Sequence, residues 1–252
     1  MIRVPSSIRS SCPGEHCPVE PAIDVLAPTG PVRAVVLVLH GGSVEGHLPV
    51  SRRKLPYLRM VPFARSIHRR AEGVAVWLLR HTHNGWNAPH MHPVQDARWA
   101  LDKIRREHPG VPVVLVGHSM GGRTALYVAD DPQVIAVCAL APWIEAGDPY
   151  QGLAGRALLI AHGDHDRTTD PAASYRYALR ARQVTDRVAR FTVLREGHAM
   201  LFRFRYWTRL VTDFVLGVLD VEPLAPYLSN AMREPTPRGL NVPLGGTRGG
   251  IR

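Results

Sequence analysis

The sequence has few cysteines and no long uninterrupted apolar run. Its three cysteines, Cys12, Cys17 and Cys138, are too scattered for a disulfide framework, so a reducing cytoplasm is the expected location. No stretch reaches the roughly eighteen apolar residues that a membrane helix needs, and no membrane span is expected. The first residues lack the apolar core of a signal peptide. These absences argue against a disulfide-rich secreted domain and against an integral membrane protein.

Lysine is also scarce, although the chain is strongly basic. The formal charge of +10 comes almost wholly from arginine, because only Lys54 and Lys103 are lysines. Seven basic residues and no acid lie between Ser51 and Arg70. This segment could attract an anionic partner, or it could be an ordinary solvated helix and loop. No basic helix with interleaved aromatics accompanies the charge, so no specific nucleic-acid partner is expected.

Length and composition indicate one globular domain. The chain has 252 residues, of which 45% are apolar and 21% are charged, and a core of this size can be buried. Residues 1–20 and 221–252 are rich in proline, glycine and polar residues, which predicts a flexible leader and a flexible tail. The catalytic domain is therefore expected to span residues 21–220.

Short apolar runs alternate with helical patterns between these ends. This alternation predicts a doubly wound, mostly parallel α/β sheet of six to seven strands. The first two strands, Ile23–Ala27 and Ala34–His40, flank a Pro-Thr-Gly-Pro turn and could form an antiparallel hairpin. The further expected strands are 73–79, 111–116, 134–140, 157–161 and 189–194. The expected helices are 57–71, 93–107, 120–129, 171–181 and 200–219.

A strand, a tight turn and a helix meet at Gly117-His118-Ser119-Met120-Gly121. Glycines in Gly-x-Ser-x-Gly allow a turn so sharp that side chains would collide with neighbouring backbone. The serine is then exposed at the start of a helix, where N–H groups stabilise developing negative charge. This context predicts Ser119 as a nucleophile.

A serine nucleophile needs a histidine base that a carboxylate orients, and in this type of sheet the order is Ser, acid, His. His198 follows the strand 189–194 and is the only histidine after His165. Asp164, Asp166 and Asp170 follow the strand 157–161 and compete as the acid. Asp170 precedes a proline and suits a helix cap, so Asp166 is favoured.

An oxyanion hole needs two main-chain donors. The N–H of Met120 is the first, directly after the nucleophile. The second is expected from His40-Gly41-Gly42-Ser43, with the N–H of Gly42 favoured and that of Ser43 as the alternate.

These motifs resemble the α/β-hydrolase superfamily over about residues 23–219. The sector from Leu140-Ala141-Pro142-Trp143 to His162 looks like the lidless dienelactone-hydrolase and cutinase-like serine esterases. That resemblance implies that Trp143 lines the acyl side of the pocket. Two departures are expected: shortened N-terminal strands, and no lid domain between Trp143 and Arg156.

A histidine-rich loop, residues 80–92, follows a strand and should lie on the catalytic face. It could form an aromatic and imidazole rim around the substrate, bind zinc or copper, or be an ordinary turn. Alternate residues of an extended segment point to opposite sides, so no metal site is assigned. Trp86, His118, Ser43 and Trp143 are the predicted substrate-binding residues.

The sequence therefore predicts a cofactor-independent enzyme that cleaves small-molecule or lipid-like carboxylic esters through an acyl-enzyme. An acyltransferase, a thioesterase or a peptidase could use the same triad. A catalytically silent fold that binds an anionic partner through residues 51–70 is the alternative from another class.

Overall fold

The structure is a computed structural model that describes residues 20–245. Most of the predicted leader, with Cys12 and Cys17, lies outside the described residues. The strands are β1 (Ala22–Leu26), β2 (Ala34–Leu39), β3 (Val74–Arg80), β4 (Val113–His118), β5 (Val134–Leu140), β6 (Ala157–Gly163), β7 (Val188–Val193) and β8 (Val242–Leu244). The helices are α1 (Leu55–Arg70), α2 (His92–Glu107), α3 (Met120–Tyr127), α4 (Pro171–Ala181), α5 (Phe204–Val218) and α6 (Pro226–Arg233). Two short 3₁₀ turns, η1 (Gln151–Leu153) and η2 (Arg238–Leu240), complete the described elements.

The strands form one sheet in the order β1-β3-β2-β4-β5-β6-β7-β8. Only the β1–β3 pair is antiparallel, and the other neighbours are parallel. The predicted doubly wound, mostly parallel sheet is confirmed, with eight strands instead of six to seven. Because the strands from β2 onward are parallel, their carboxyl ends meet at one edge, where such sheets bind ligands.

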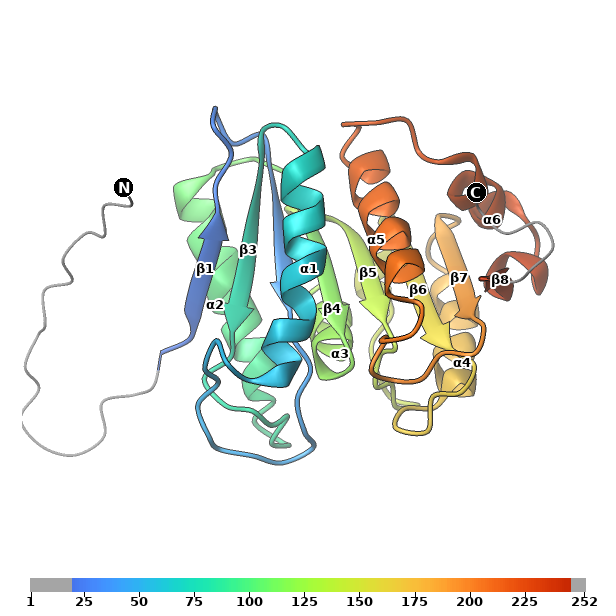
Figure 1. The fold of residues 1–252 in the computed structure, drawn as a ribbon, viewed down its shortest axis with the longest axis horizontal. Helices are drawn as coiled ribbons and strands as arrows, with labels where there is room; N and C mark the ends of the chain where they lie inside the picture. Colours follow the sequence, from blue (N-terminus) through green and yellow to red (C-terminus); the bar gives the residue numbers. More distant parts are fainter. Residues whose placement is uncertain (1–19, 246–252) are drawn as a thin grey trace, which may run out of the picture.

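Helices cover both faces of the sheet. Figure 1 shows α1 and α5 in front of it, with α2, α3 and α4 behind. Each layer closes its own apolar core, one against α1 and α5 and the other against α2, α3 and α4. β2 and β4 are buried along their whole length, as continuous apolar runs between two helical layers should be.

The predicted hairpin between the first two strands is wrong. β1 pairs with β3, where Ala22 lies opposite Arg80, while β2 lies between β3 and β4. The central position of β2 follows from its burial on both faces, which a hairpin at the edge of the sheet would not give. Asp24 helps to hold β1 at the edge, because it accepts hydrogen bonds from Arg80 Nε at 3.1 Å and the Tyr57 hydroxyl at 2.7 Å.

The predicted flexible tail also needs correction within its described part. Residues 226–244 form α6, η2 and β8, and β8 adds to the sheet beside β7. Leu228, Leu240 and Leu244 are buried, so this segment contributes apolar surface that its polar composition concealed. Arg182 anchors it by donating to the carbonyls of Ala231 and Glu234 at 3.3 and 2.8 Å. The division into a leader, a catalytic domain and a tail stays a prediction in other respects.

The connection between β5 and β6 matters for access to the sheet edge. Residues 141–156 contain only η1 as regular structure, so no lid domain is inserted there, as expected. Within residues 20–245, no helix is both long enough and apolar enough to cross a membrane.

Candidate active site

Ser119 occupies the turn between β4 and α3. Its backbone has φ 56° and ψ −118°, a conformation that a residue with a side chain adopts only when its surroundings enforce it. A Cβ at Gly117 would lie 2.1 Å from the carbonyl oxygen of Gly121, and a Cβ at Gly121 would lie 2.4 Å from that of Leu39. The two glycines therefore let three stretches of backbone pack together, and this packing holds the serine in its strained position.

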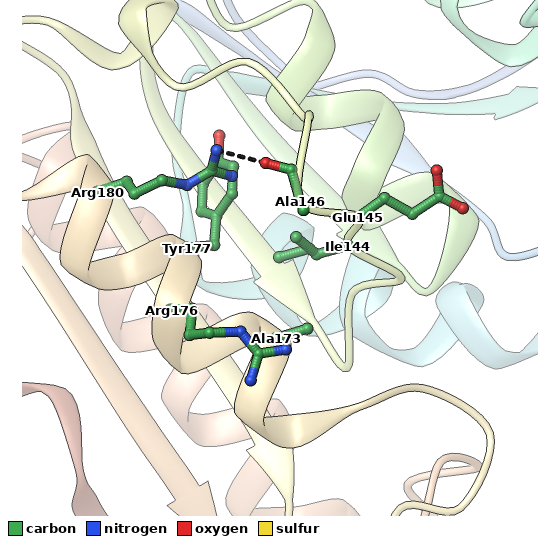
Figure 2. A pocket seen from close by; sticks show the side chains of 7 residues that line it. All are labelled: Ile144, Glu145, Ala146, Ala173, Arg176, Tyr177 and Arg180. Carbon is green, nitrogen blue, oxygen red and sulfur yellow. Dashed lines mark hydrogen bonds between the residues drawn. The ribbon is translucent and has the colours of Figure 1, made fainter.

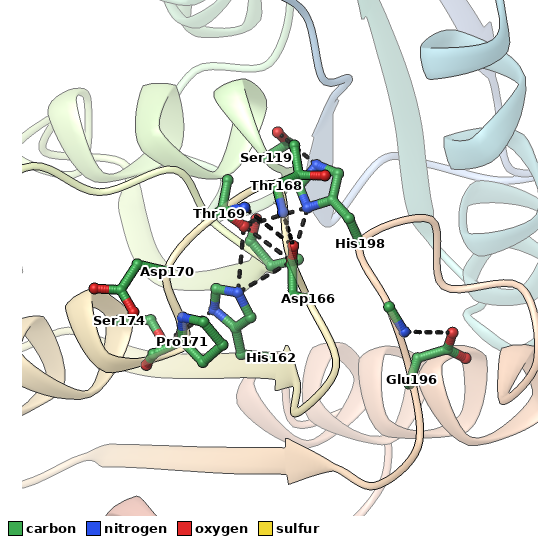
Figure 3. A network of polar contacts seen from close by, with 12 residues as sticks. Ser119, His162, Asp166, Thr168, Thr169, Asp170, Pro171, Ser174, Glu196 and His198 are labelled. Atoms are coloured by element: carbon green, nitrogen blue, oxygen red, sulfur yellow. Dashed lines mark hydrogen bonds and ion pairs between the residues drawn. The ribbon is translucent and has the colours of Figure 1, made fainter.

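His198 lies within hydrogen-bond distance of both Ser119 and Asp166. His198 Nε2 is 3.0 Å from Ser119 Oγ, and His198 Nδ1 is 2.8 Å from Asp166 Oδ2 (Figure 3). The three side chains come from the segments that follow β4, β6 and β7. The geometry is that of a nucleophile, a base and an orienting carboxylate in line.

Asp166 is held as a carboxylate although its side chain is fully buried. Burial acts to raise the pKa of Asp166, but hydrogen bonds from His162, His198 and the N–H groups of Thr169 and Thr168 lower it well below its ordinary value. The two N–H groups donate to Oδ1 at 3.0 and 2.8 Å, while both imidazoles contact Oδ2. A charged acceptor surrounded by donors in this way keeps a fixed orientation.

His162 was not assigned a role from the sequence. Its Nε2 lies 3.1 Å from Asp166 Oδ2 and its Nδ1 lies 3.0 Å from Ser174 Oγ, which in turn accepts from Arg190 Nε at 3.1 Å. Burial lowers the pKa of His162, so the ring is neutral. With its proton on Nε2 the neutral ring donates to Asp166, while the single proton of the Ser174 hydroxyl is shared between His162 Nδ1 and the carbonyl of Pro171 at 2.8 Å. The signal in the sequence was a polar residue, His162, at the end of an otherwise apolar strand.

The other two aspartates that competed as the acid have different partners. Asp164 Oδ1 accepts from the N–H of Glu196 at 3.3 Å, across to the loop after β7. Asp170 caps α4, because its Oδ1 accepts from the N–H of Ala172 at 2.8 Å. The structure therefore brings only Asp166, of these three, to the imidazole of His198.

The loop after β2 lies against the start of α3. A Cβ at Gly42 would lie 2.6 Å from Met120 Cε and 2.5 Å from the carbonyl oxygen of Asn84, so only glycine fits there. The N–H of Ser43 donates to Asn84 at 2.9 Å, which removes Ser43 as the alternate oxyanion donor. Within residues 20–245, neither Gly42 nor Met120 has a recorded acceptor for its N–H. Two free donors thus lie near Ser119.

The buried side chain of His40 holds the loop after β2 in place. Its Nδ1 donates to the carbonyl of Gly41 at 2.7 Å, and its Nε2 accepts from the N–H of His81 at 3.3 Å. Burial, with a smaller effect of His81, lowers the pKa of His40 to about 3. The neutral ring can accept at Nε2, which the contact with His81 requires.

His118 was predicted to bind substrate, and its surroundings do not fit that role. The side chain is buried, and its Nε2 donates to the carbonyl of His198 at 3.0 Å. Its ring packs against the ring of His198, with centroids 4.8 Å apart. His118 therefore helps to position His198, and its buried side chain is not available to contact a substrate. Ser43 is exposed, but its hydroxyl donates to the carbonyl of Glu45 at 2.7 Å.

Arg123 joins the two tryptophans that the sequence assigned to substrate binding. Its guanidinium lies 4.5 Å from the ring of Trp86 and 4.3 Å from that of Trp143. Trp86 is only 3% exposed and forms part of this stack, so its predicted contact with substrate is not supported. Trp143 stays partly exposed, and its N–H donates to the carbonyl of Ser119 at 3.2 Å. Its place beside the acyl group stays a prediction.

Arg123 itself was missed from the sequence. It is buried and pairs with Asp148 at 2.7 Å and with Glu145 at 2.8 Å. Cation–π contacts of this kind are strongest when water is excluded. Arg123 therefore ties the loop after β3 and the loop after β5 to α3, the helix that begins beside Ser119. The signal was a charged residue within a helix that otherwise faces the core.

The histidine-rich loop gathers several imidazoles at the surface. The rings of His83 and His92 lie 4.5 Å apart, and His47 and His90 lie next to them. In the described part of the chain, however, no group of three or more histidines, cysteines or carboxylates is placed to hold a metal ion. The metal alternative for this loop therefore has no structural support.

The recesses on the surface differ in their relation to Ser119. One of about 210 Å³ lies between the loop after β5 and α4 (Figure 2). Arg180 crosses it and donates to the carbonyl of Ala146 at 2.7 Å. None of the triad side chains lines this recess. Two others border the loop after β2 and the segment after His198, respectively.

The basic segment, residues 51–70, is mostly α1. Arg52 pairs with Asp24, and Arg70 pairs with Asp213 at 2.9 Å and Glu222 at 2.6 Å. Two arginines of this segment therefore form ion pairs with acidic side chains of the same chain.

The sheet, with a serine, a histidine and an aspartate in this geometry, has the arrangement that α/β serine hydrolases use. Comparison with known proteins agrees. A family model described as serine aminopeptidase, S33, matches residues 80–157. Human monoglyceride lipase is 32% identical over 105 residues, which are 40% of this chain and 32% of that protein. The chain thus spans about a third of the length of that curated relative.

Solved structures show the same fold. Est1E from Butyrivibrio proteoclasticus aligns with a TM-score of 0.63 at 13% identity, over 82% of this chain and 97% of Est1E. A serine hydrolase without a lid, from Xanthomonas campestris, aligns with a TM-score of 0.59 at 20% identity, over 84% of this chain and all (100%) of that chain. The chain therefore has the α/β-hydrolase fold, and its lidless architecture has a counterpart among these structures.

Proposed function

We propose that the protein hydrolyses carboxylic esters through an acyl-enzyme on Ser119. The observation that carries this proposal is the unbroken line of contacts from Ser119 Oγ to His198 Nε2 at 3.0 Å and from His198 Nδ1 to Asp166 Oδ2 at 2.8 Å. Human monoglyceride lipase among the relatives makes a small or lipid-like ester a reasonable substrate.

The first half of the reaction forms the acyl-enzyme. His198 Nε2 takes the proton of Ser119 as its oxygen attacks the ester carbonyl. The carbonyl oxygen becomes an oxyanion, which the N–H groups of Gly42 and Met120 bind. The resulting imidazolium is stabilised by Asp166 and gives its proton to the leaving alcohol oxygen as the carbon–oxygen bond breaks.

The second half repeats these steps with water. His198 removes a proton from a water molecule that attacks the acyl carbonyl, and the same two N–H groups bind the second oxyanion. Collapse releases the carboxylic acid and returns the proton to Ser119. No cofactor takes part in this scheme.

Replacement of the nucleophile tests the proposal. Ser119→Ala should lower kcat/KM for p-nitrophenyl acetate and butyrate by at least about a thousandfold. Ser229→Ala, at a partly exposed serine on α6, is the matched control and should leave both rates unchanged. A fluorophosphonate probe should label the wild type and the control but not Ser119→Ala. Undiminished turnover by Ser119→Ala would refute the assignment.

The matching family model names an aminopeptidase, so amides belong in the same assay. Amino-acid p-nitroanilides and acyl thioesters should be turned over more slowly than oxygen esters of the same acyl group. A preference for the anilides would identify the protein as a peptidase that uses the same triad.

A further inference from the structure

An apolar groove of about 400 Å³ begins directly beside the catalytic histidine. One wall is α1, and the other is the segment that follows His198 together with the start of α5. The lining residues are Leu55, Leu58, Arg59, Pro62, Phe63, Ala199, Met200, Leu201 and Phe204.

The groove presents apolar side chains to water. Leu55 is 73% exposed, Leu201 is 67% exposed and Leu58 is 44% exposed. Phe63 and Met200 form a buried floor. Leucines gathered with this exposure around a recess are typical of a binding surface, since single exposed leucines are common but grouped ones are not.

Arg59 is the only charged residue that lines the groove. No ion pair of Arg59 is recorded with any residue from 20 to 245, and the loss of hydration on burial lowers the pKa of its guanidinium. Arg59 is only partly buried, and an arginine of this kind can place its aliphatic stem along an apolar wall while its guanidinium keeps part of its hydration. Arg59 is therefore compatible with an apolar occupant of the groove.

The position of the groove decides which part of an ester it can hold. In the tetrahedral intermediate, the oxyanion points to the N–H groups of Gly42 and Met120. The leaving oxygen has to lie beside His198 Nε2, because that atom gives it a proton. Ala199, Met200 and Leu201 follow His198 directly in the chain, so the groove opens on the side of the leaving oxygen.

We propose that this groove binds the alcohol part of the substrate, and that the substrate class is carboxylic esters of apolar, chain-like alcohols. This inference rests on the proposed ester hydrolysis. A chain bound in the neighbouring recess of about 210 Å³ would instead lie beside the oxyanion loop, because His40, Gly42 and Leu48 line that recess.

Two substrate series separate these arrangements. In alkyl acetates from methyl to hexyl, kcat/KM measured by proton release should rise about twofold to fourfold per methylene, the upper value being that for complete burial. In methyl esters from acetate to hexanoate, the increase in kcat/KM per methylene of the acyl chain should be smaller. All alkyl acetates form the same acetyl-enzyme, so a kcat limited by deacylation should not change with the alcohol.

A polar substitution in the groove tests the location. Leu58→Gln/Leu201→Gln keeps side chains of similar size at two exposed positions and should bring the rise to below about 1.5-fold per methylene. The rate of each variant with methyl acetate, whose alcohol is the shortest of the series, is the reference from which its rise per methylene is measured. Leu48→Gln, at a leucine of the other recess that is about as exposed as Leu201, is the matched control and should keep the full rise.

The outcomes are distinct. The groove assignment is overturned when kcat/KM follows the acyl chain and not the alcohol, when the rise survives in the double variant, or when Leu48→Gln abolishes it. Failure of the wild type to hydrolyse any ester, with no fluorophosphonate label on Ser119, would overturn the proposed function itself. Thermal unfolding of each variant shows whether a lost rise comes from a lost fold.

Discussion

Replacement of His162 by leucine should weaken the folded state by a predictable amount. His162 and Asp166 side chains have no exposed surface, and the imidazole is a donor to the carboxylate at 3.1 Å. Leucine has a similar volume but no polar atom, so the change removes the hydrogen bond to Asp166 and the contact with Ser174 without a large cavity. Ser174 keeps its other two contacts, with Pro171 at 2.8 Å and Arg190 at 3.1 Å.

A hydrogen bond to a buried charge contributes about 1.5–3 kcal/mol. We expect His162→Leu to lower the free energy of unfolding by this amount at pH 8, measured by urea denaturation and tryptophan fluorescence. Asp166 retains its donors from His198, Thr168 and Thr169. The value of kcat/KM for esters should therefore fall about tenfold, far less than in Ser119→Ala.

The difference in stability should depend on pH in a defined direction. In the wild type the pKa of His162 and that of Asp166 are both below their unfolded values. On acidification the unfolded chain therefore gains a proton first, at His162 below about pH 6.5 and at Asp166 below about pH 4. Each gain favours unfolding of the wild type. The gap between the wild type and His162→Leu should be largest near pH 8 and narrower at pH 5.

His162→Gln is the informative partner variant, because its amide can still donate to the carboxylate. It should recover part of the stability and of kcat/KM. Equal stability of the wild type and His162→Leu at pH 8 would show that this hydrogen bond contributes nothing. A gap that is the same at pH 8 and pH 5 would contradict the lowered pKa of His162 in the folded state.

Three further predictions concern the framework of the site. Gly121→Ala should abolish soluble folded protein, because its Cβ would lie 2.4 Å from a main-chain oxygen, whereas Gly147→Ala, with open space around it, should fold normally. Arg123→Met should cost about 3–5 kcal/mol in urea unfolding, since it leaves a buried carboxylate unpaired, while Lys103→Met at an exposed pair should cost less than about 1 kcal/mol. A cost of Arg123→Met as small as that control would contradict the anchoring role. Asp170→Ala should lower stability by about 1 kcal/mol through the lost helix cap and leave kcat/KM unchanged; a large loss of activity would mean that Asp170 also serves the reaction.

Much of the fold could be read from local patterns. Strands such as Val134–Leu140 have the same bounds in the sequence analysis and in the structure, because a buried parallel strand is a continuous apolar run. Pairing partners could not be read in this way. β1 joins β3 and β8 joins β7 through contacts between distant residues, which no local pattern encodes.

The roles of the residues that surround the triad could not be read from local sequence patterns either. His118 and Trp86 have side chains that suit a binding surface, and their neighbours in the chain gave no reason to expect burial. Only the packing of α3 against the loop after β3 shows that Trp86 stacks on Arg123. Only the position of the loop after β7 shows that the His118 imidazole donates a hydrogen bond to the carbonyl of His198.

The sequence by itself determined Ser119, because a nucleophile elbow is a local device of strand, turn and helix within a few residues. It also determined the order in which an acid and a base follow, since each comes after its own strand. The tertiary structure decided which aspartate meets His198, that His162 is a second donor to it, and where an apolar groove opens. These are distances between side chains on separate strands and helices, and they exist only once the sheet has aligned its carboxyl ends at one edge.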